Sequence, residues 1–435
     1  MLKRKIYNEL DNWKNYKNNK ALLIRGARQV GKTTAVRIFG KKNYRQFIEI
    51  NFEKDHTARQ AFAGNKNAET IILNLSAMGY GPFVKGETLI FFDEIQSCPD
   101  ARTAIKFLVE DGKYDYIESG SLLGINYRDV SSYPVGFEHQ VDMFPLDFEE
   151  FLWACGISEE VIGVLRKSYI TKTAVTDFLH ERIMERFRQY MVVGGMPEVV
   201  ATFLDDKDLS RTIQIQKDII NSYRDDISKY AGKDKQTAKL VFDAIPLQLC
   251  KEDKKFVLSD IEKGASQRKY GDATQWLADA GVAYFSYNTK TFELPFAFHE
   301  KRNLYKLFML DTGLLCNMSI PKMQFKVLNG EINVNEGALT ENYVAGELKK
   351  KGFALNYYDR KSKHELDFIF HENNGISIIE VKSGNDYMKH ASLNAAIRLF
   401  QDKIERSIVL NKFNVQEKDG IIYYPLYMTM FLQSI

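Results

Sequence analysis

The stretch that most constrains this chain is GARQVGKT at residues 26–33, which carries the pattern GxxxxGK[ST]. The apolar residues at 21–24 are typical of a short strand, and TAVRIF after the pattern is typical of a helix. Glycines at such a turn let backbone N–H groups point inward around phosphate oxygens, and the helix directs the positive end of its dipole at them. The sequence therefore predicts a phosphate-binding loop.

The side chains of this loop have separate expected roles. Lys32 would reach the β and γ phosphates of ATP, and the Thr33 hydroxyl would ligate the Mg²⁺ that bridges their oxygens. The residues expected to contact the nucleotide are Gly26, Ala27, Arg28, Gln29, Val30, Gly31, Lys32, Thr33 and Thr34. The expected ligands are therefore ATP and Mg²⁺.

Two carboxylates follow the apolar strand signal TLIFFDEIQ at residues 88–96. This strand and FIEINF at 47–52 alternate with helical stretches, which is the pattern of a parallel sheet with helical crossovers. Ligands of such sheets bind at the carboxyl ends of the strands. We expect Asp93 to hold the magnesium through water and Glu94 to polarise the water that attacks the γ phosphate.

The next strand signal, YDYIESGSLLG at 114–124, ends in small polar residues. Ser119 or Ser121 would hydrogen-bond the γ phosphate or the attacking water, and the alternative is a Gly/Ser turn without a role in catalysis. A fifth strand, HQVDMFPL at 139–146, is expected to close the sheet.

Composition bounds the partners and the cellular location. The chain has 435 residues, enough for two to four domains, and its 60 basic and 57 acidic residues nearly cancel, so any anion site is local. The four cysteines are far apart and form no CxxC pair, which indicates free thiols in a reducing compartment. Because no segment has the length of a signal peptide's apolar region or of a membrane span, we expect a cytoplasmic protein without a membrane partner.

Seven sequence segments along the chain carry a resemblance to a known family. They are LIRGARQVGKTT at 23–34, LIFFDEIQ at 89–96, ESGSLL at 118–123, FPLDFEEFL at 144–152, GGMPEVV at 194–200, YRDDISKY at 223–230 and YKLFMLDTGLL at 305–315. Together they resemble a widespread prokaryotic family of AAA-type P-loop ATPases. The resemblance covers nearly the whole chain and implies an ATPase that hydrolyses Mg-ATP.

Relatives of this kind often assemble so that an arginine of a neighbouring subunit completes the site. This chain has Phe137 where relatives often have a basic residue, and Arg128 is the remaining candidate for that arginine. The resemblance therefore leaves open both a monomer and an ATP-dependent homo-oligomer.

The middle of the chain is expected to be mostly helical. A helix that ends at the glycine pair before Pro197 is predicted first, and three helices and a hairpin over 282–296, turning near Asn288, follow. The latter set resembles a winged helix. In a DNA-binding version Gln267, Arg268 and Lys269 would open the recognition helix, and the alternative is a plain packing module.

A second group of charged residues lies in the last hundred residues. Glu341 falls on a predicted helix, Asp367 on a strand, and Glu380 and Lys382 on the same face of the next strand. Asp367 and Glu380 would hold a second Mg²⁺ or Mn²⁺, and Lys382 would orient or activate the attacking water.

This order of residues resembles the PD-(D/E)XK restriction-endonuclease-like fold, in which Glu341 matches the acid of the first helix. Charges on the outer face of a strand would produce the same pattern without any function.

We therefore expect an α/β protein in four parts. They are an AAA-type P-loop NTPase parallel-sheet core at 1–152, a helical extension at 153–235, a winged-helix-like module at 236–330 and a restriction-endonuclease-like α/β domain at 331–435. ATP hydrolysis would move the attached domains, with DNA as the expected partner. Two functions remain: an ATP-dependent nuclease in defence or DNA maintenance, and an ATP-driven switch or scaffold whose nuclease-like domain does not cleave.

Overall fold

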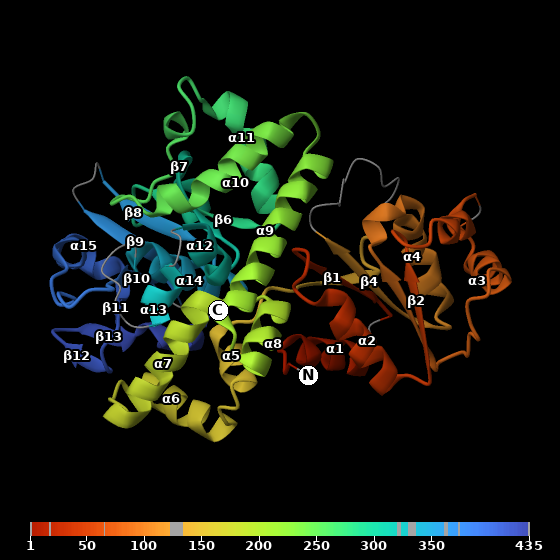
Figure 1. Ribbon diagram of the computed structural model, residues 1–435, viewed down its shortest axis with the longest axis horizontal. Helices are drawn as coiled ribbons and strands as arrows, with labels where there is room; N and C mark the ends of the chain where they lie inside the picture. The colour runs from red at the N-terminus through yellow and green to blue at the C-terminus, as the bar shows by residue number, and fades with distance from the viewer. Residues whose placement is uncertain are drawn as a thin grey trace. The chain divides into compact units, whose positions relative to one another are not determined.

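The computed structural model describes residues 2–16, 19–64, 66–121, 134–319, 323–328, 336–360, 364–372 and 375–433. The chain divides into two compact units, whose elements are labelled in Figure 1. The first unit contains Arg4–Phe144, and the second consists largely of Pro145–Ala278 and Val282–Ile435.

A five-stranded sheet with the order β2-β3-β4-β1-β5 forms the centre of the first unit. Its strands are β1 (Ala21–Gly26), β2 (Gln46–Asn51), β3 (Thr88–Asp93), β4 (Asp115–Ser121) and β5 (Glu138–Asp142). All four neighbouring pairs are parallel. The sheet and all five of its expected strands are thereby confirmed.

Helices cover this sheet, as parallel crossovers require. They are α1 (Ile6–Asn15), α2 (Lys32–Asn43), α3 (Ala68–Ala77) and α4 (Pro99–Asp111). Every residue of β3 is buried, which explains why TLIFFD is an almost continuous apolar run. Ile90 and Phe92 of this strand pack in one core with Ile71 of α3 and Ile105 of α4, while α2 contacts β1 to β4.

The second unit contains a mixed sheet with the order β12-β13-β11-β10-β9-β8-β6-β7. Its strands are β6 (Ala283–Thr289), β7 (Glu300–Met309), β8 (Asn356–Asp359), β9 (Glu365–Glu372), β10 (Gly375–Val381), β11 (Ile404–Asn411), β12 (Gln416–Lys418) and β13 (Ile421–Pro425). Leu393 and Ala396 of α15 (Ala391–Phe400) pack in one core with Leu366 and Ile378 of the sheet. Helix α14 (Glu336–Lys350) contacts β6, β7 and β10.

The remaining helices of the second unit lie mostly between the two sheets in sequence. They are α5 (Phe148–Ala154), α6 (Glu159–Thr171), α7 (Asp177–Val193), α8 (Pro197–Asp206), α9 (Leu209–Tyr230), α10 (Lys235–Leu249), α11 (Gln267–Asp279), α12 (Thr312–Ser319) and α13 (Met323–Leu328). The predicted helix end at the glycine pair is confirmed, because α7 ends at Gly194 and α8 starts at Pro197.

Two of the sequence strings that carry the family resemblance, GGMP and LDTGLL, meet in the second unit. The Asp311 carboxylate accepts the Gly195 N–H at 2.6 Å and the Leu314 N–H, at the start of α12, at 2.9 Å. A Cβ at Gly194, where φ is +73°, would lie 2.1 Å from Asp311 Oδ1, and a Cβ at Gly195 would lie 2.1 Å from the Leu146 carbonyl oxygen. Both glycines are therefore required by close packing.

The hairpin expected over residues 282–296 is placed differently by the structure. Asn288 lies inside β6, and the partner of β6 is β7, which begins at Glu300. The segment YKLFM is buried throughout and supplies the buried half of the second strand. Since β6 also pairs with β8, this hairpin belongs to the same sheet as the strands of residues 331–435.

Candidate functional site

The predicted phosphate loop connects the last residue of β1, Gly26, to the first residue of α2, Lys32. Gly31 has φ of +97°, a conformation that favours glycine, and Gln29 is also left-handed. A Cβ at Gly26 would lie 2.2 Å from the Met143 carbonyl oxygen, so the chain passes too close for any side chain there. These backbone requirements account for both glycines of the pattern.

The Lys32 side chain folds back onto this loop. Its ammonium donates to the carbonyl oxygens of Gly26 at 2.9 Å and Ala27 at 2.8 Å, and the residue is buried. Burial lowers the pKa of Lys32 to about 8, against the opposing effect of Glu94 and Asp93. The loop therefore holds a cation whose charge is disfavoured by its surroundings.

Asp93, at the end of β3, is the residue on which the other elements converge. The Thr33 hydroxyl lies 3.1 Å from each of its carboxylate oxygens, and Asn51 Nδ2 donates to Oδ2 at 2.8 Å. The buried Ser119 hydroxyl of β4 donates to Oδ1. The structure thus brings Thr33, Asp93 and Ser119 together, and it adds Asn51 from the end of β2.

Glu94 follows β3 directly and adopts a left-handed backbone conformation with φ of 55°. Gln96 Nε2 donates to its carboxylate. Burial raises the pKa of Glu94, with Gln96 and Lys32 acting in the opposite direction. The carboxylate is only partly buried, so it can exchange protons with water.

The other predicted loop residues have various surroundings. Arg28 forms an ion pair with Glu53 at 3.2 Å, Val30 is buried and Thr34 is exposed. Ser121 is the last residue of β4 and pairs in register with Gly26. The Ser121 side chain and Arg128 lie outside the part of the chain that the structure describes.

The second unit contains a buried cluster of charges around Lys306 of β7. Its ammonium lies 2.7 Å from Glu365, 3.4 Å from Glu341 and 3.7 Å from Asp367, and the side chain is fully buried. Glu341 also pairs with Lys254 at 2.6 Å. Sequence reasoning missed both lysines, although a single lysine within the apolar run LYKLFM was a visible signal.

Glu341, Asp367 and Glu380 all belong to this cluster, as the sequence predicted. Burial and the charges of Glu341 and Glu380 together raise the pKa of Asp367 to about 8, against the opposing effect of Lys306 and Lys254. Asp367 Oδ2 accepts the Val381 N–H at 2.8 Å. Lys382, one residue after β10, pairs with Glu380 at 2.7 Å, as their expected position on one face requires.

The donor set of the cluster does not fit a divalent metal. Lys306 lies within 3.7 Å of Glu341, Glu365 and Asp367, Lys254 pairs with Glu341 and Lys382 pairs with Glu380, so lysine ammonium groups already neutralise these carboxylates. Among the residues that the structure describes, no three His, Cys, Asp or Glu side chains are grouped in a way that could hold a metal ion. The expected second Mg²⁺ or Mn²⁺ at Asp367 and Glu380 therefore finds no support.

The first unit, in contrast, defines a class of protein. Its strand order, the glycine loop between β1 and α2 and the carboxylate at the end of β3 together make a P-loop NTPase core. Residues 18–152 match the family model described as an AAA domain. Residues 184–324 and 336–428 match two models described as domains of unknown function, DUF8612 and DUF4143.

Three solved structures that resemble the chain are only distantly similar to it. A Walker-type ATPase of Pyrococcus abyssi is 15% identical, with 74% of this chain and 96% of that chain covered and a TM-score of 0.45. The ORC1 protein of Aeropyrum pernix in complex with DNA is 10% identical (72% and 87% covered, TM-score 0.27), and AMPPCP-bound DnaA of Aquifex aeolicus is 13% identical (63% and 86%, TM-score 0.30). No curated protein matches the chain.

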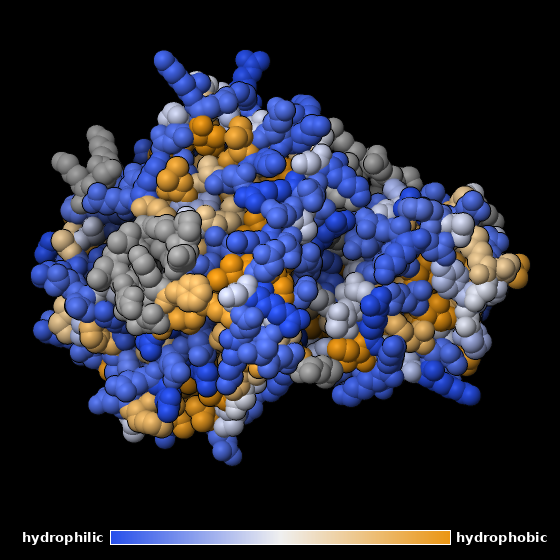
Figure 2. Space-filling model, viewed as in Figure 1, coloured by the Kyte–Doolittle hydropathy of each residue, from blue (hydrophilic) through white to orange (hydrophobic). Residues whose placement is uncertain are grey.

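The hydropathy of the surface and of the helices concerns a possible contact with a membrane. On the face drawn in Figure 2, hydrophilic residues cover most of the surface and apolar residues show in smaller groups. Within the described ranges, every helix is too short or too polar to pass through a bilayer.

Proposed function

We propose that the first unit binds Mg-ATP and hydrolyses it to ADP and phosphate. The observation that carries this proposal is the contact of the Thr33 hydroxyl with Asp93 at 3.1 Å, beside the buried ammonium of Lys32. Hydroxyl and carboxylate oxygens are the ligands that Mg²⁺ prefers, so Thr33 and Asp93 fit this ion. When bound, Mg²⁺ would neutralise charge on the β and γ phosphates.

The chain's own residues would divide the remaining work. Lys32 would exchange the carbonyl oxygens of Gly26 and Ala27 for phosphate oxygens, which relieves the unfavourable burial of its charge. Glu94, whose pKa is raised by burial, would accept a proton from the attacking water. Ser119 and Asn51 would hold the Asp93 carboxylate in place through their hydrogen bonds.

The charged cluster of the second unit favours the switch or scaffold over the nuclease. Cleavage of the expected type needs a metal between Asp367 and Glu380, and the Lys306 ammonium is 3.7 Å from Asp367 instead. We therefore propose that ATP turnover drives a change in a second unit that binds its partner without cutting it. DNA as this partner, and an ATP-dependent homo-oligomer, are further proposals.

Release of phosphate from ATP tests the first proposal. The wild type should hydrolyse ATP, and Lys32→Ala should not bind nucleotide. Lys41→Ala is the matched control, because Lys41 is exposed in the last turn of the same helix and should retain full activity. A wild type that binds no ATP, or a Lys32→Ala variant as active as Lys41→Ala, would refute the proposal.

A cleavage assay tests the second proposal. Wild-type protein with ATP and either Mg²⁺ or Mn²⁺ should leave single-stranded DNA, duplex DNA and RNA intact. Cleavage that is lost in Asp367→Asn, with ATP hydrolysis unchanged, would establish the nuclease and overturn the non-cleaving role.

A further inference from the structure

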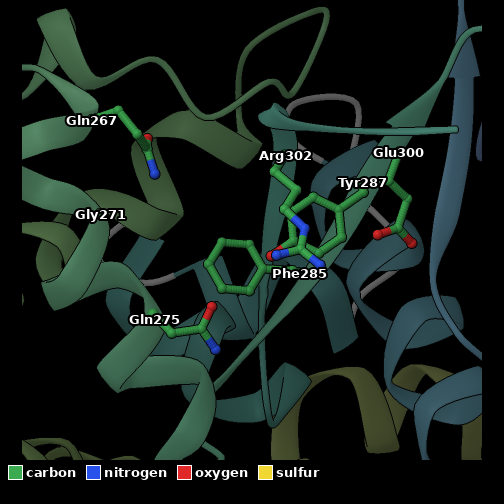
Figure 3. Close-up of a pocket in the computed structure, with 7 residues that line it drawn as sticks. All are labelled: Gln267, Gly271, Gln275, Phe285, Tyr287, Glu300 and Arg302. Atoms are coloured by element: carbon green, nitrogen blue, oxygen red, sulfur yellow. The ribbon is translucent and has the colours of Figure 1, made fainter. Parts of the chain in front are cut away.

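A cavity of about 270 Å³ lies between α11 and the β6–β7 hairpin, and none of its lining residues belongs to the nucleotide site or to the charged cluster around Lys306. It is lined by Gln267, Gly271, Gln275, Phe285, Tyr287, Glu300 and Arg302, which are drawn in Figure 3. Three secondary-structure elements thus contribute side chains to one opening in the surface of the second unit.

The helical wall of this cavity consists of residues spaced by four. Gln267, Gly271 and Gln275 therefore fall on one face of α11, with the glycine between two amide side chains. Figure 3 shows both glutamine side chains on the helix side of the opening. Since Gly271 has no side chain, the flexible Gln267 amide takes part of the space beside it, and its Nε2 would lie 2.9 Å from a Cβ at Gly271. A flat group that enters beside the glycine would therefore contact this amide.

The opposite wall is aromatic and carries charge. The rings of Phe285 and Tyr287 are stacked with centroids 5.1 Å apart and planes 13° apart, and Tyr305 holds Phe285 by an edge-to-face contact at 4.9 Å. Figure 3 shows the Arg302 side chain running beside the Tyr287 ring toward Phe285. Glu300 is fixed by Asn356, whose Nδ2 donates to Oε1 at 2.9 Å.

We infer that this cavity binds one unpaired nucleotide of a single-stranded nucleic acid. A base is flat enough for the gap opposite Gly271, can stack on the aromatic wall, and offers donors and acceptors to the amides of Gln267 and Gln275. Its phosphate would contact Arg302, and the exposed Arg268 next to Gln267 on α11 adds positive charge on the helix side.

The shape and surroundings of the cavity also favour a nucleotide within a single-stranded nucleic acid over a free nucleotide or a duplex. Arg302 at the cavity and Arg268 on the neighbouring helix are exposed, so neighbouring nucleotides of the same nucleic acid can be held as well. A base inside a duplex is stacked on both faces and has its pairing edge occupied, so it cannot enter the cavity. This inference goes beyond the proposed ATP hydrolysis and does not depend on it.

Binding of fluorescent probes to the full chain tests the inference. The probes are a labelled 20-nucleotide single strand of DNA, its RNA equivalent, the corresponding duplex and a labelled mononucleotide, followed by fluorescence anisotropy. A single strand, of DNA or of RNA, should bind at least about ten-fold more tightly than either the duplex or the mononucleotide. Comparison of the affinities for the DNA and the RNA single strands shows which of the two nucleic acids the cavity binds.

A filled cavity provides the decisive variant. Gly271→Leu places a side chain in the gap and should weaken strand binding at least about ten-fold, with helix content and ATP hydrolysis unchanged. Gly163→Leu is the matched control, because Gly163 lies on another helix with open space around it and should bind like wild type. If Gly271→Leu does not fold, Phe285→Leu supplies the same test by removing the stacking surface.

The charged contact has its own readout. Arg302→Gln should lower the slope of log affinity against log salt concentration by roughly 0.7, the value of one phosphate contact in a single strand. Absence of single-strand binding, duplex binding as tight as strand binding, or equal affinities of Gly271→Leu and Gly163→Leu would overturn the inference.

Discussion

The Lys32 ammonium donates hydrogen bonds to two backbone carbonyl oxygens and not to a carboxylate. Two carbonyl contacts within 2.9 Å compensate only partly for burial, so the pKa of this lysine is lowered to about 8. Phosphate oxygens would favour the charged form more strongly than carbonyl oxygens do. Nucleotide binding should therefore be linked to protonation of Lys32.

The first prediction concerns this linkage. Near pH 8.5 a lysine with a pKa of about 8 is mostly neutral in the free protein, whereas bound phosphate raises its pKa and restores the proton. ATP binding should then take up roughly half a proton or more. Isothermal titration calorimetry in two buffers with different ionisation enthalpies measures this number, and Lys32→Arg, which stays charged, should take up close to none at this position.

Lys306 is a second buried lysine, and the carboxylates around it keep its ammonium charged. Burial alone would lower its pKa, but Glu341, Glu365 and Asp367 outweigh burial and raise it, so the ammonium stays charged. Removing this cation would leave buried carboxylates without their neutralising partner.

We predict that Lys306→Met destabilises the second unit by about 3–5 kcal/mol, as expected for breaking a buried ion pair on one side. Lys301→Met, on the exposed part of the same strand, should change stability by less than about 0.5 kcal/mol. Urea unfolding of the two variants is the measurement. Similar midpoints for both would show that the lysine does not neutralise the cluster.

The residues of the nucleotide site were largely predictable because the glycine loop and the strand-end carboxylates are local signals. Asn51 was missed, although it lies near the end of the expected strand 47–52 at the same edge of the sheet, because sequence alone does not show which side chains meet there. The lysines of the cluster were missed for another reason. Lys254 and Lys306 meet Glu341 only through the tertiary fold, and no local pattern links them.

At the scale of elements, the sheets were easier to predict than their boundaries. Strands β1 and β3 of the first unit have apolar runs, because both of their faces are covered. The β6–β7 hairpin has a ten-residue connection, 290–299, and this length hides its partner from a local reading. The Asn288 region resembled a turn because Asn is frequent in turns, but pairing with β7 and β8 keeps it in a strand.

The contact between GGMP and LDTGLL gives a prediction at this scale. Asp311→Ala removes acceptors from the Gly195 and Leu314 N–H groups, and the stability of the second unit should fall by about 2–4 kcal/mol. Asp243→Ala, which breaks an exposed ion pair with Arg224, is the control and should cost less than about 1 kcal/mol. Thermal unfolding of the pair compares them, and equal shifts would mean that Asp311 does not join the two strings.

At the scale of the whole molecule, the two units have different chemistry. The first combines a phosphate loop with the Thr33 hydroxyl and the Asp93 carboxylate, and the second combines a cluster of carboxylates and lysines with a cavity lined by aromatic rings and amides. This pairing of sites agrees with the proposal that ATP turnover in the first unit controls partner binding by the second unit. That control depends on the proposed hydrolysis of ATP at Thr33, Asp93 and Glu94.

Turnover by Glu94→Gln tests that claim most directly, measured as phosphate release with ATP binding followed in parallel. The variant should bind ATP with nearly wild-type affinity and hydrolyse it at least about a hundred-fold more slowly, because the amide cannot accept a proton from water. Glu87→Gln, at the opposite end of β3, removes a charge from an exposed ion pair with Arg45 and should turn over like wild type. Equal rates in Glu94→Gln and Glu87→Gln would contradict the account.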